Sequence, residues 1–145
     1  MKEFKFGLSS LLRLKNIQLE SEKTKLSQHL LNEQLVKEAI ASLLDERQKA
    51  ATAVEKLAEI DGSDLKALSA FLVGAAARGT ILQSQLEASV RAIKEQRTRV
   101  LAAERDVQLL VRIHDKQFAQ WKFELDRRIE EAAQESWLAI HGHRS

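Results

Sequence analysis

Apolar residues recur along this chain on two ladders with a strict spacing of seven residues. Twelve of the sixteen ladder positions are apolar, whereas 44% hydrophobic content would fill about seven of sixteen by chance. A sustained average spacing of 3.5 residues is the pattern of a coiled coil. The apolar positions are Leu12, Leu19, Leu26, Ile40 and Val54 on the first ladder, and Leu65, Leu72, Leu86, Ile93, Val100, Val107 and Trp121 on the second.

The two ladders are separated by one break, Ile60-Asp61-Gly62-Ser63-Asp64, in a chain that contains no proline. Gly62 suits the left-handed conformation that ends many helices, and Asp61 or Ser63 can cap a following helix. The pattern therefore predicts an all-α fold, a long two-helix antiparallel coiled-coil hairpin whose second helix is longer than the first. We expect a single domain over 1–145, with a helix over about 4–59, a turn at about 60–63, a helix over about 64–140 and a frayed tail over 141–145.

Folding about Gly62 predicts which residues of the second helix project beyond the first. Leu12 would lie opposite Ile113, and the chain after about Gln120 would have no intramolecular partner. This overhang is apolar and would leave its large side chains in water. These side chains are Trp121, Phe123, Leu125, Ile129 and Trp137.

A second unusual stretch, 67–86, contains Arg78 as its only charged residue, whereas about one residue in three is charged elsewhere. Small residues there would let the two helices approach closely beside the turn. The alternative reading is a partner-docking face centred on Phe71. Polar residues that interrupt the seam, Glu33, Arg47, Gln96 and His114, are expected to specify the register of the helices.

The composition excludes several classes of chemistry and disfavours others. The chain has no cysteine, and neither a phosphate-binding loop nor a catalytic arrangement occurs, so no enzyme activity and no cofactor are expected. His29 and His114 would lie far apart, and His141-Gly142-His143 lacks a third ligand, so no metal site is predicted. Lys and Arg number 23 against 21 Asp and Glu, which argues against nucleic-acid binding. An arginine arm for nucleic acid would use Arg97, Arg99, Arg105 and Arg112, which do not form one face.

No membrane span and no signal peptide were apparent, because Met1-Lys2-Glu3-Phe4 lacks an apolar core and no uninterrupted hydrophobic run approaches ~18 residues. The sequence therefore favours a cytoplasmic location.

The run Phe4-Lys5-Phe6-Gly7-Leu8-Ser9-Ser10-Leu11-Leu12-Arg13-Leu14-Lys15 resembles the start of the bacterial flagellar FliJ family. Phe71-Leu72 followed by Ile81 and Leu86 resembles the family's long second helix. The segment from Phe118 through Trp121, Glu124 and Leu125 to Arg128 resembles its C-terminal end, although Glu135-Ser136-Trp137 departs from the Asp-Glu often found there.

The resemblance implies a stalk-like component of the flagellar type III export apparatus, peripheral at the cytoplasmic face of the inner membrane through its partners only. The implied partners are the export ATPase hexamer, the cytoplasmic domain of the export gate and export chaperones. The expected ATPase-binding residues are Leu8, Leu12, Arg13, Phe118, Trp121 and Leu125, and the expected gate-binding residues are Phe71, Leu72, Ala75 and Leu82. Two alternatives stay open. One is the stalk of a virulence type III secretion system, and the other is a homodimeric coiled-coil scaffold in which two open chains pair rather than each folding back on itself.

Overall fold

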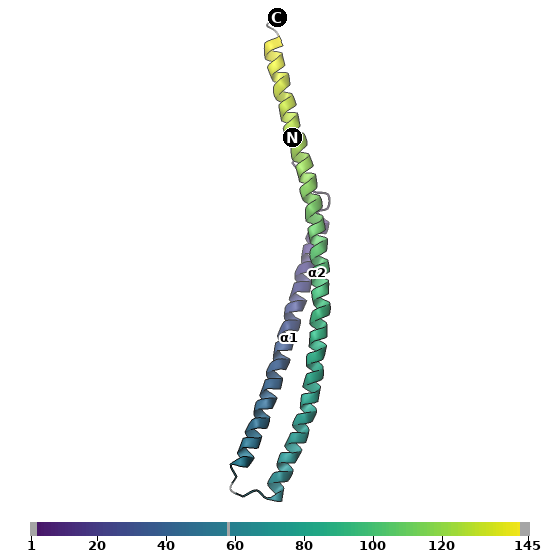
Figure 1. The fold of residues 1–145 in the computed structure, drawn as a ribbon. Helices are drawn as coiled ribbons and strands as arrows, with labels where there is room; N and C mark the ends of the chain where they lie inside the picture. Colours follow the sequence, from purple (N-terminus) through teal and green to yellow (C-terminus); the bar gives the residue numbers. More distant parts are fainter. Residues whose placement is uncertain (1–2, 58, 143–145) are drawn as a thin grey trace. The chain divides into compact units, whose positions relative to one another are not determined.

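The structure is a computed structural model that describes residues 3–57 and 59–142. Two helices, α1 (Ser9–Glu55) and α2 (Gly62–His141), pack together as an antiparallel hairpin, and α2 is the longer of the two. No strand occurs among the described residues. Figure 1 shows the two helices and the connection between them. The predicted fold class is therefore confirmed.

The connection between the helices is longer than expected, because α1 ends at Glu55 rather than near residue 59. Asp61 caps α2: its carboxylate Oδ1 accepts a hydrogen bond from the Asp64 backbone N at 2.8 Å, and its own N donates to Asp64 Oδ2 at 3.4 Å. This reciprocal pair satisfies backbone donors that a helix start leaves open. Gly62 is the first residue of α2, and no described glycine has a positive φ, so the expected left-handed turn at Gly62 was wrong.

The longer connection also shifts the register between the helices. Lys15 pairs with Asp106, Asn32 with Ser89, and Leu43 lies against Gly79. Each partner on α2 lies three or four positions earlier than folding about Gly62 predicts, because the connection is centred before that residue.

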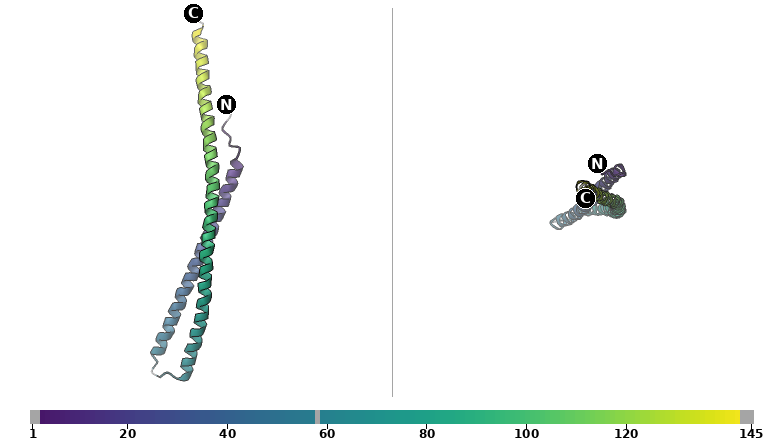
Figure 2. Two further views of the ribbon diagram at one scale, coloured as in Figure 1. Left: turned by 45° about the vertical axis from the view of Figure 1, so that its right-hand side comes forward. Right: turned by 90° about the horizontal axis from the view of Figure 1, so that it is seen from above.

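Contacts divide the hairpin into two units, which are described separately: Ser21–Val100, and Met1–Glu20 with Leu101–Ser145. In the unit 21–100 the two helices run antiparallel from the turn (Figure 2). Its residues of low exposure recur at alternating spacings of three and four, as a heptad seam requires. They include Leu26, His29, Glu33, Val36, Ile40 and Leu43 on α1 and Ala75, Leu82, Leu86, Ser89, Ile93, Gln96 and Val100 on α2.

Two pairs of polar residues link the two helices along this seam. The Asn32 amide donates to Ser89 Oγ at 3.3 Å, and the buried Gln96 amide donates to the backbone oxygen of Glu22 at 3.0 Å. Such pairs fix one alignment of the helices. Arg47, also expected to interrupt the seam, is exposed instead.

The second unit contains the two chain ends, and α1 begins there at Ser9 rather than near residue 4. Residues 3–6 are not helical, and the Ser9 backbone N donates to the Phe6 oxygen at 3.1 Å as the helix begins. In an extended segment, residues two apart share a side. Phe4 and Phe6 therefore both reach the ring of His114, which they could not do together from one turn of a helix.

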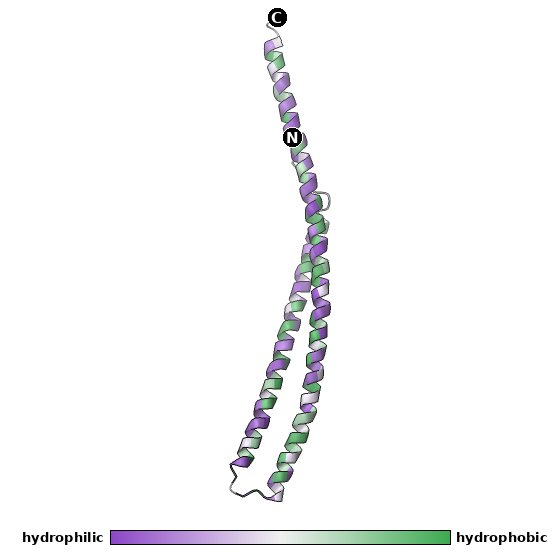
Figure 3. Ribbon diagram, viewed as in Figure 1, coloured by the Kyte–Doolittle hydropathy of each residue, from purple (hydrophilic) through white to green (hydrophobic). Residues whose placement is uncertain are grey.

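By length and composition alone, α2 contains a stretch apolar enough to cross a bilayer, and almost none of that stretch is buried in the hairpin. No such stretch was expected from the sequence. Residues 65–82, the least polar part of α2, carry only Lys66 and Arg78 as charges, and Figure 3 colours this end of α2 mostly green and white.

Candidate functional site: two apolar surfaces

Phe4 organises an aromatic cluster on α2 in the unit that holds the chain ends. Its ring lies 5.4 Å from the ring of His114, 5.3 Å from that of Phe118 and 5.8 Å from that of Trp121, measured between centroids. Phe6 meets His114 edge to face at 5.1 Å. Edge-to-face and tilted arrangements are the favoured geometries of aromatic pairs. The non-helical start of the chain is thereby anchored to α2.

This cluster changes the expected end of the paired region. Trp121 was expected to lack an intramolecular partner, but it packs against Phe4 and Phe118 and is half-buried. The ring that packs on both Phe118 and Trp121 is that of Phe4. The sequence signal for this contact was the Phe-x-Phe spacing, which was used only as a family resemblance.

The remaining residues of the expected ATPase-binding set differ in exposure. Arg13 is exposed, Leu8 is exposed, and Leu12 is half-buried on the seam. Leu125 is half-buried and is the last described residue of α2 that is not exposed.

Beyond Leu125, every described residue of α2 is exposed. Four of them are large and apolar: Ile129, Trp137, Leu138 and Ile140. We call residues 126–141 the overhang. Its stabilising contacts are local: Arg127 Nε lies 3.7 Å from Glu131 Oε1, and the rings of Trp137 and His141 stack at 4.5 Å. Just before it, Phe123 is 68% exposed at the edge of an open depression formed with Lys116, Ala119, Gln120 and Glu124.

The charge-poor stretch of α2 lies in the other unit. Ala75 is fully buried, and a Cβ on Gly79 would sit 3.6 Å from Leu43 Cδ2, so small residues here do let the helices approach closely. Of the expected gate-binding residues, Phe71, Leu72 and Leu82 are half-buried. Ala75 has no surface to offer a partner while the hairpin is closed.

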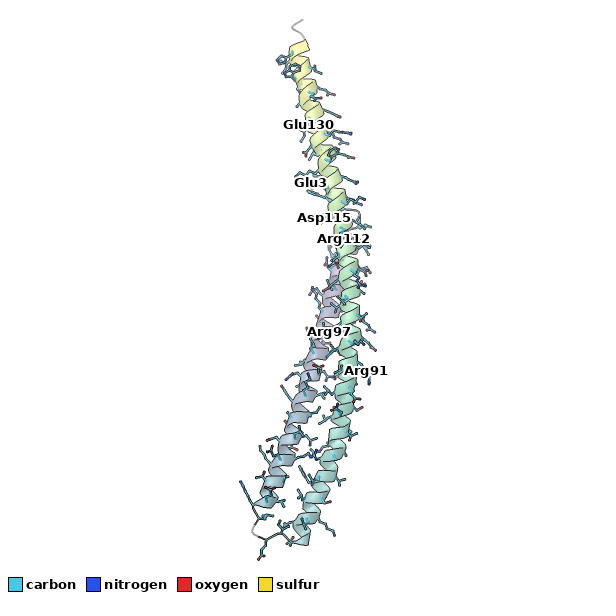
Figure 4. The ribbon with its side chains drawn as sticks, viewed as in Figure 1. Glu3, Arg91, Arg97, Arg112, Asp115 and Glu130 are labelled. Atoms are coloured by element: carbon cyan, nitrogen blue, oxygen red, sulfur yellow. The ribbon has the colours of Figure 1, made fainter. Side chains whose placement is uncertain are left out.

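No metal centre emerges from the described residues. No group of three or more His, Cys, Asp or Glu side chains among them could hold a metal ion. His143 lies outside the described residues, so the His141-Gly142-His143 pairing is not addressed. Figure 4 labels Arg91 and Arg97 on α2. Six residues at ~100° each place these side chains about 120° apart around the helix, so they do not share a face.

The chain matches no protein-family model, no curated protein and no solved structure.

Proposed function

We propose that this chain is a non-enzymatic helical stalk of a bacterial flagellar type III export apparatus. In this role it would bind the export ATPase ring through its chain-end unit, contact the cytoplasmic domain of the export gate and assist export chaperones at the cytoplasmic face of the inner membrane. The observation that carries the proposal is the overhang, in which α2 continues for sixteen residues beyond Leu125 with its apolar side chains exposed.

The overhang supports a binding role because it lacks the packing that stabilises the rest of α2. Isolated helices of this length are marginally stable in water, so a partner that buries Ile129, Trp137 and Ile140 would also order them. The Phe-x-Phe start supports the flagellar assignment, since both rings hold the first residues of the chain against α2 next to the overhang.

Contact with the export gate is assigned to the charge-poor stretch through Phe71, Leu72 and Leu82. These three side chains are half-buried, so part of each remains exposed beside the seam and can contact a partner. A buried Ala75 would act by allowing close helix packing under this surface.

The ATPase assignment is tested with the flagellar export ATPase encoded in the same genome. The full chain should stimulate ATP hydrolysis and ring assembly, whereas a chain truncated after Leu125 should not, although its aromatic cluster and seam are intact. A finer variant, Trp137→Ser with Ile140→Ser, should lose most of the stimulation. Its matched control is Ala133→Ser with Ala139→Ser, which introduces the same number of serines into the same segment.

Undiminished stimulation by the truncated chain would contradict a contact through the overhang and would move the ATPase contact to the residues that the truncated chain retains. Stimulation of a virulence-type ATPase but not of the flagellar one would favour the alternative secretion system.

A further inference from the structure

The turn-proximal part of α2 carries apolar residues on the side that packs against α1 and also on the opposite side, which α1 does not cover. The opposite side is defined by uncharged residues, six of which recur at alternating spacings of three and four, with Val73 beside them. We call it the back face: Ala67, Ala70, Val73, Gly74, Ala77, Ile81 and Ser84. Val73 is 69% exposed and Ile81 is 57% exposed. An apolar face of a helix is normally buried against a partner, and the exposed back face has none among the described residues of the hairpin.

The shape of the back face suits another helix at short range. A Cβ built on Gly74 meets no atom within 4 Å, and the neighbouring positions are mostly alanine. The distance between packed helices is set by the side chains at their contact, within about 8–10 Å. Alanine and glycine would place a second helix near the lower limit, where Val73 and Ile81 could cover the sides of the contact.

The charges at the two ends of the back face identify the occupant. Lys66 and Glu87 flank it with opposite charges, both are exposed, and neither forms an ion pair with another described residue. The face is therefore complementary to itself when one copy is reversed. We propose that two copies of this chain associate through their back faces, with the two α2 helices antiparallel.

In this antiparallel arrangement the heptad positions fall into register. Ala67 lies opposite Ser84 of the second copy, Ala70 opposite its Ile81, and Gly74 opposite its Ala77, so the one large side chain at these positions, Ile81, meets an alanine. Lys66 of each copy lies beside Glu87 of the other, which gives two equivalent ion pairs about a twofold axis. A parallel pair would instead place Lys66 level with Lys66 and Glu87 level with Glu87, so that neither ion pair could form.

A bilayer is the main competing occupant, because the same part of α2 is apolar enough for one. Charge argues against it. Residues 55–66, at the turn, carry four acidic side chains against two basic ones, Lys56 and Lys66, and anionic lipid headgroups would repel this net negative charge. The association does not depend on the proposed export function, and its test needs no other protein.

The test is sedimentation velocity of the full chain over a range of concentrations. The wild-type chain should show a reversible monomer–dimer equilibrium. Lys66→Glu and Glu87→Lys should each raise the dimer dissociation constant by about tenfold or more, since each replaces two attractive pairs by two repulsive ones. The double variant should restore the wild-type constant. The control Lys94→Glu makes the same charge change on an exposed residue of α2 beyond the back face and should leave the constant unchanged.

A second variant checks the back face itself. Gly74→Glu should abolish the dimer while circular dichroism keeps the helical signal of the hairpin, because its side chain meets open space within one chain. A wild-type chain that stays monomeric at its highest soluble concentration overturns the proposal. So does a double variant that fails to restore association, or a Gly74→Glu chain that dimerises normally. Flotation of the monomeric wild-type chain with phosphatidylcholine–phosphatidylglycerol vesicles would assign the face to lipid instead.

Discussion

Gln96 and Glu22 join the two helices inside the seam. The Gln96 amide donates both to the Glu22 carboxylate and to the Glu22 backbone oxygen, and Gln96 itself is buried. Lys25 adds an ion pair, with its Nζ 3.7 Å from Glu22 Oε1. The ionised carboxylate of Glu22 is thus the acceptor in this contact. The contact between the two helices therefore depends on the ionisation of Glu22.

The first prediction concerns the acid stability of the hairpin. The hydrogen bond from Gln96 lowers the pKa of Glu22 below its ordinary value of 4.5, and Lys25 and Arg99 lower it further. The unfolded chain therefore binds a proton more readily than the folded one, so this contribution is complete above about pH 4.5 and is lost as pH falls through the folded-state pKa. Glu22→Gln should lower the melting temperature at about pH 7, and this effect should be smaller at about pH 3.

Glu130→Gln provides the control for this measurement, because Glu130 is an exposed carboxylate on the overhang (Figure 4). Thermal unfolding followed by circular dichroism should give equal shifts for this control at both pH values. A Glu22→Gln difference that stays constant with pH would show that the carboxylate does not stabilise the hairpin through its charge.

The second prediction concerns the close packing at Ala75, which is fully buried. Ala75→Leu inserts a larger side chain where the small residues let α1 and α2 approach, and overpacking of this kind costs about 1–3 kcal/mol. Urea unfolding should report this loss. Ala102→Leu makes the same change at an exposed position of α2 and should alter stability by less than about 0.5 kcal/mol. Equal effects of the two substitutions would contradict close packing.

Sequence reasoning predicted the hairpin and its seam because a repeat of 3.5 residues has one simple structural solution. The low exposure of Leu19, Ile93 and Val100 on the predicted ladders follows directly from that repeat. The predicted ends of the helices were wrong, because one or two local contacts determine the residue at which a helix begins or ends. The cap formed by Asp61 and Asp64 set the start of α2, and the earlier end of α1 then shifted the register.

The candidate site was harder to derive for the same reason. The placement of Phe4 on Trp121 depends on residues 3–6 not being helical, which a helical pattern of apolar positions does not reveal. Conversely, Ala75 looked like part of an exposed uncharged face, since the heptad phase alone did not show which side of this charge-poor helix α1 would cover.

The third prediction concerns the aromatic cluster. Phe4→Ala removes ring contacts to His114, Phe118 and Trp121 and should destabilise the chain-end unit by about 1–3 kcal/mol, less than a fully buried phenylalanine would. In a Trp137→Phe background, the fluorescence of Trp121 should shift to longer wavelength as its ring becomes more hydrated. Phe123→Ala, which removes a mostly exposed ring, should leave the emission in place. An unchanged spectrum after Phe4→Ala would mean that the start of the chain is not anchored in solution.

The last prediction separates docking from packing at Phe71. Because this ring is half-buried, its removal should cost the hairpin only about 1–2 kcal/mol of apolar burial, and helicity by circular dichroism should remain close to that of the wild type. If the exposed part of the ring anchors the export gate, Phe71→Ala should weaken binding to the purified cytoplasmic domain of the gate by tenfold or more, as expected of an aromatic hot spot. Calorimetric titration measures this loss. Val90→Ala removes an exposed apolar side chain from α2 outside the charge-poor stretch and should leave gate binding unchanged. If Phe71→Ala instead lowers helicity and melting temperature together while gate binding falls only in proportion to the folded fraction, Phe71 belongs to the packing of the hairpin and the gate contact must lie elsewhere.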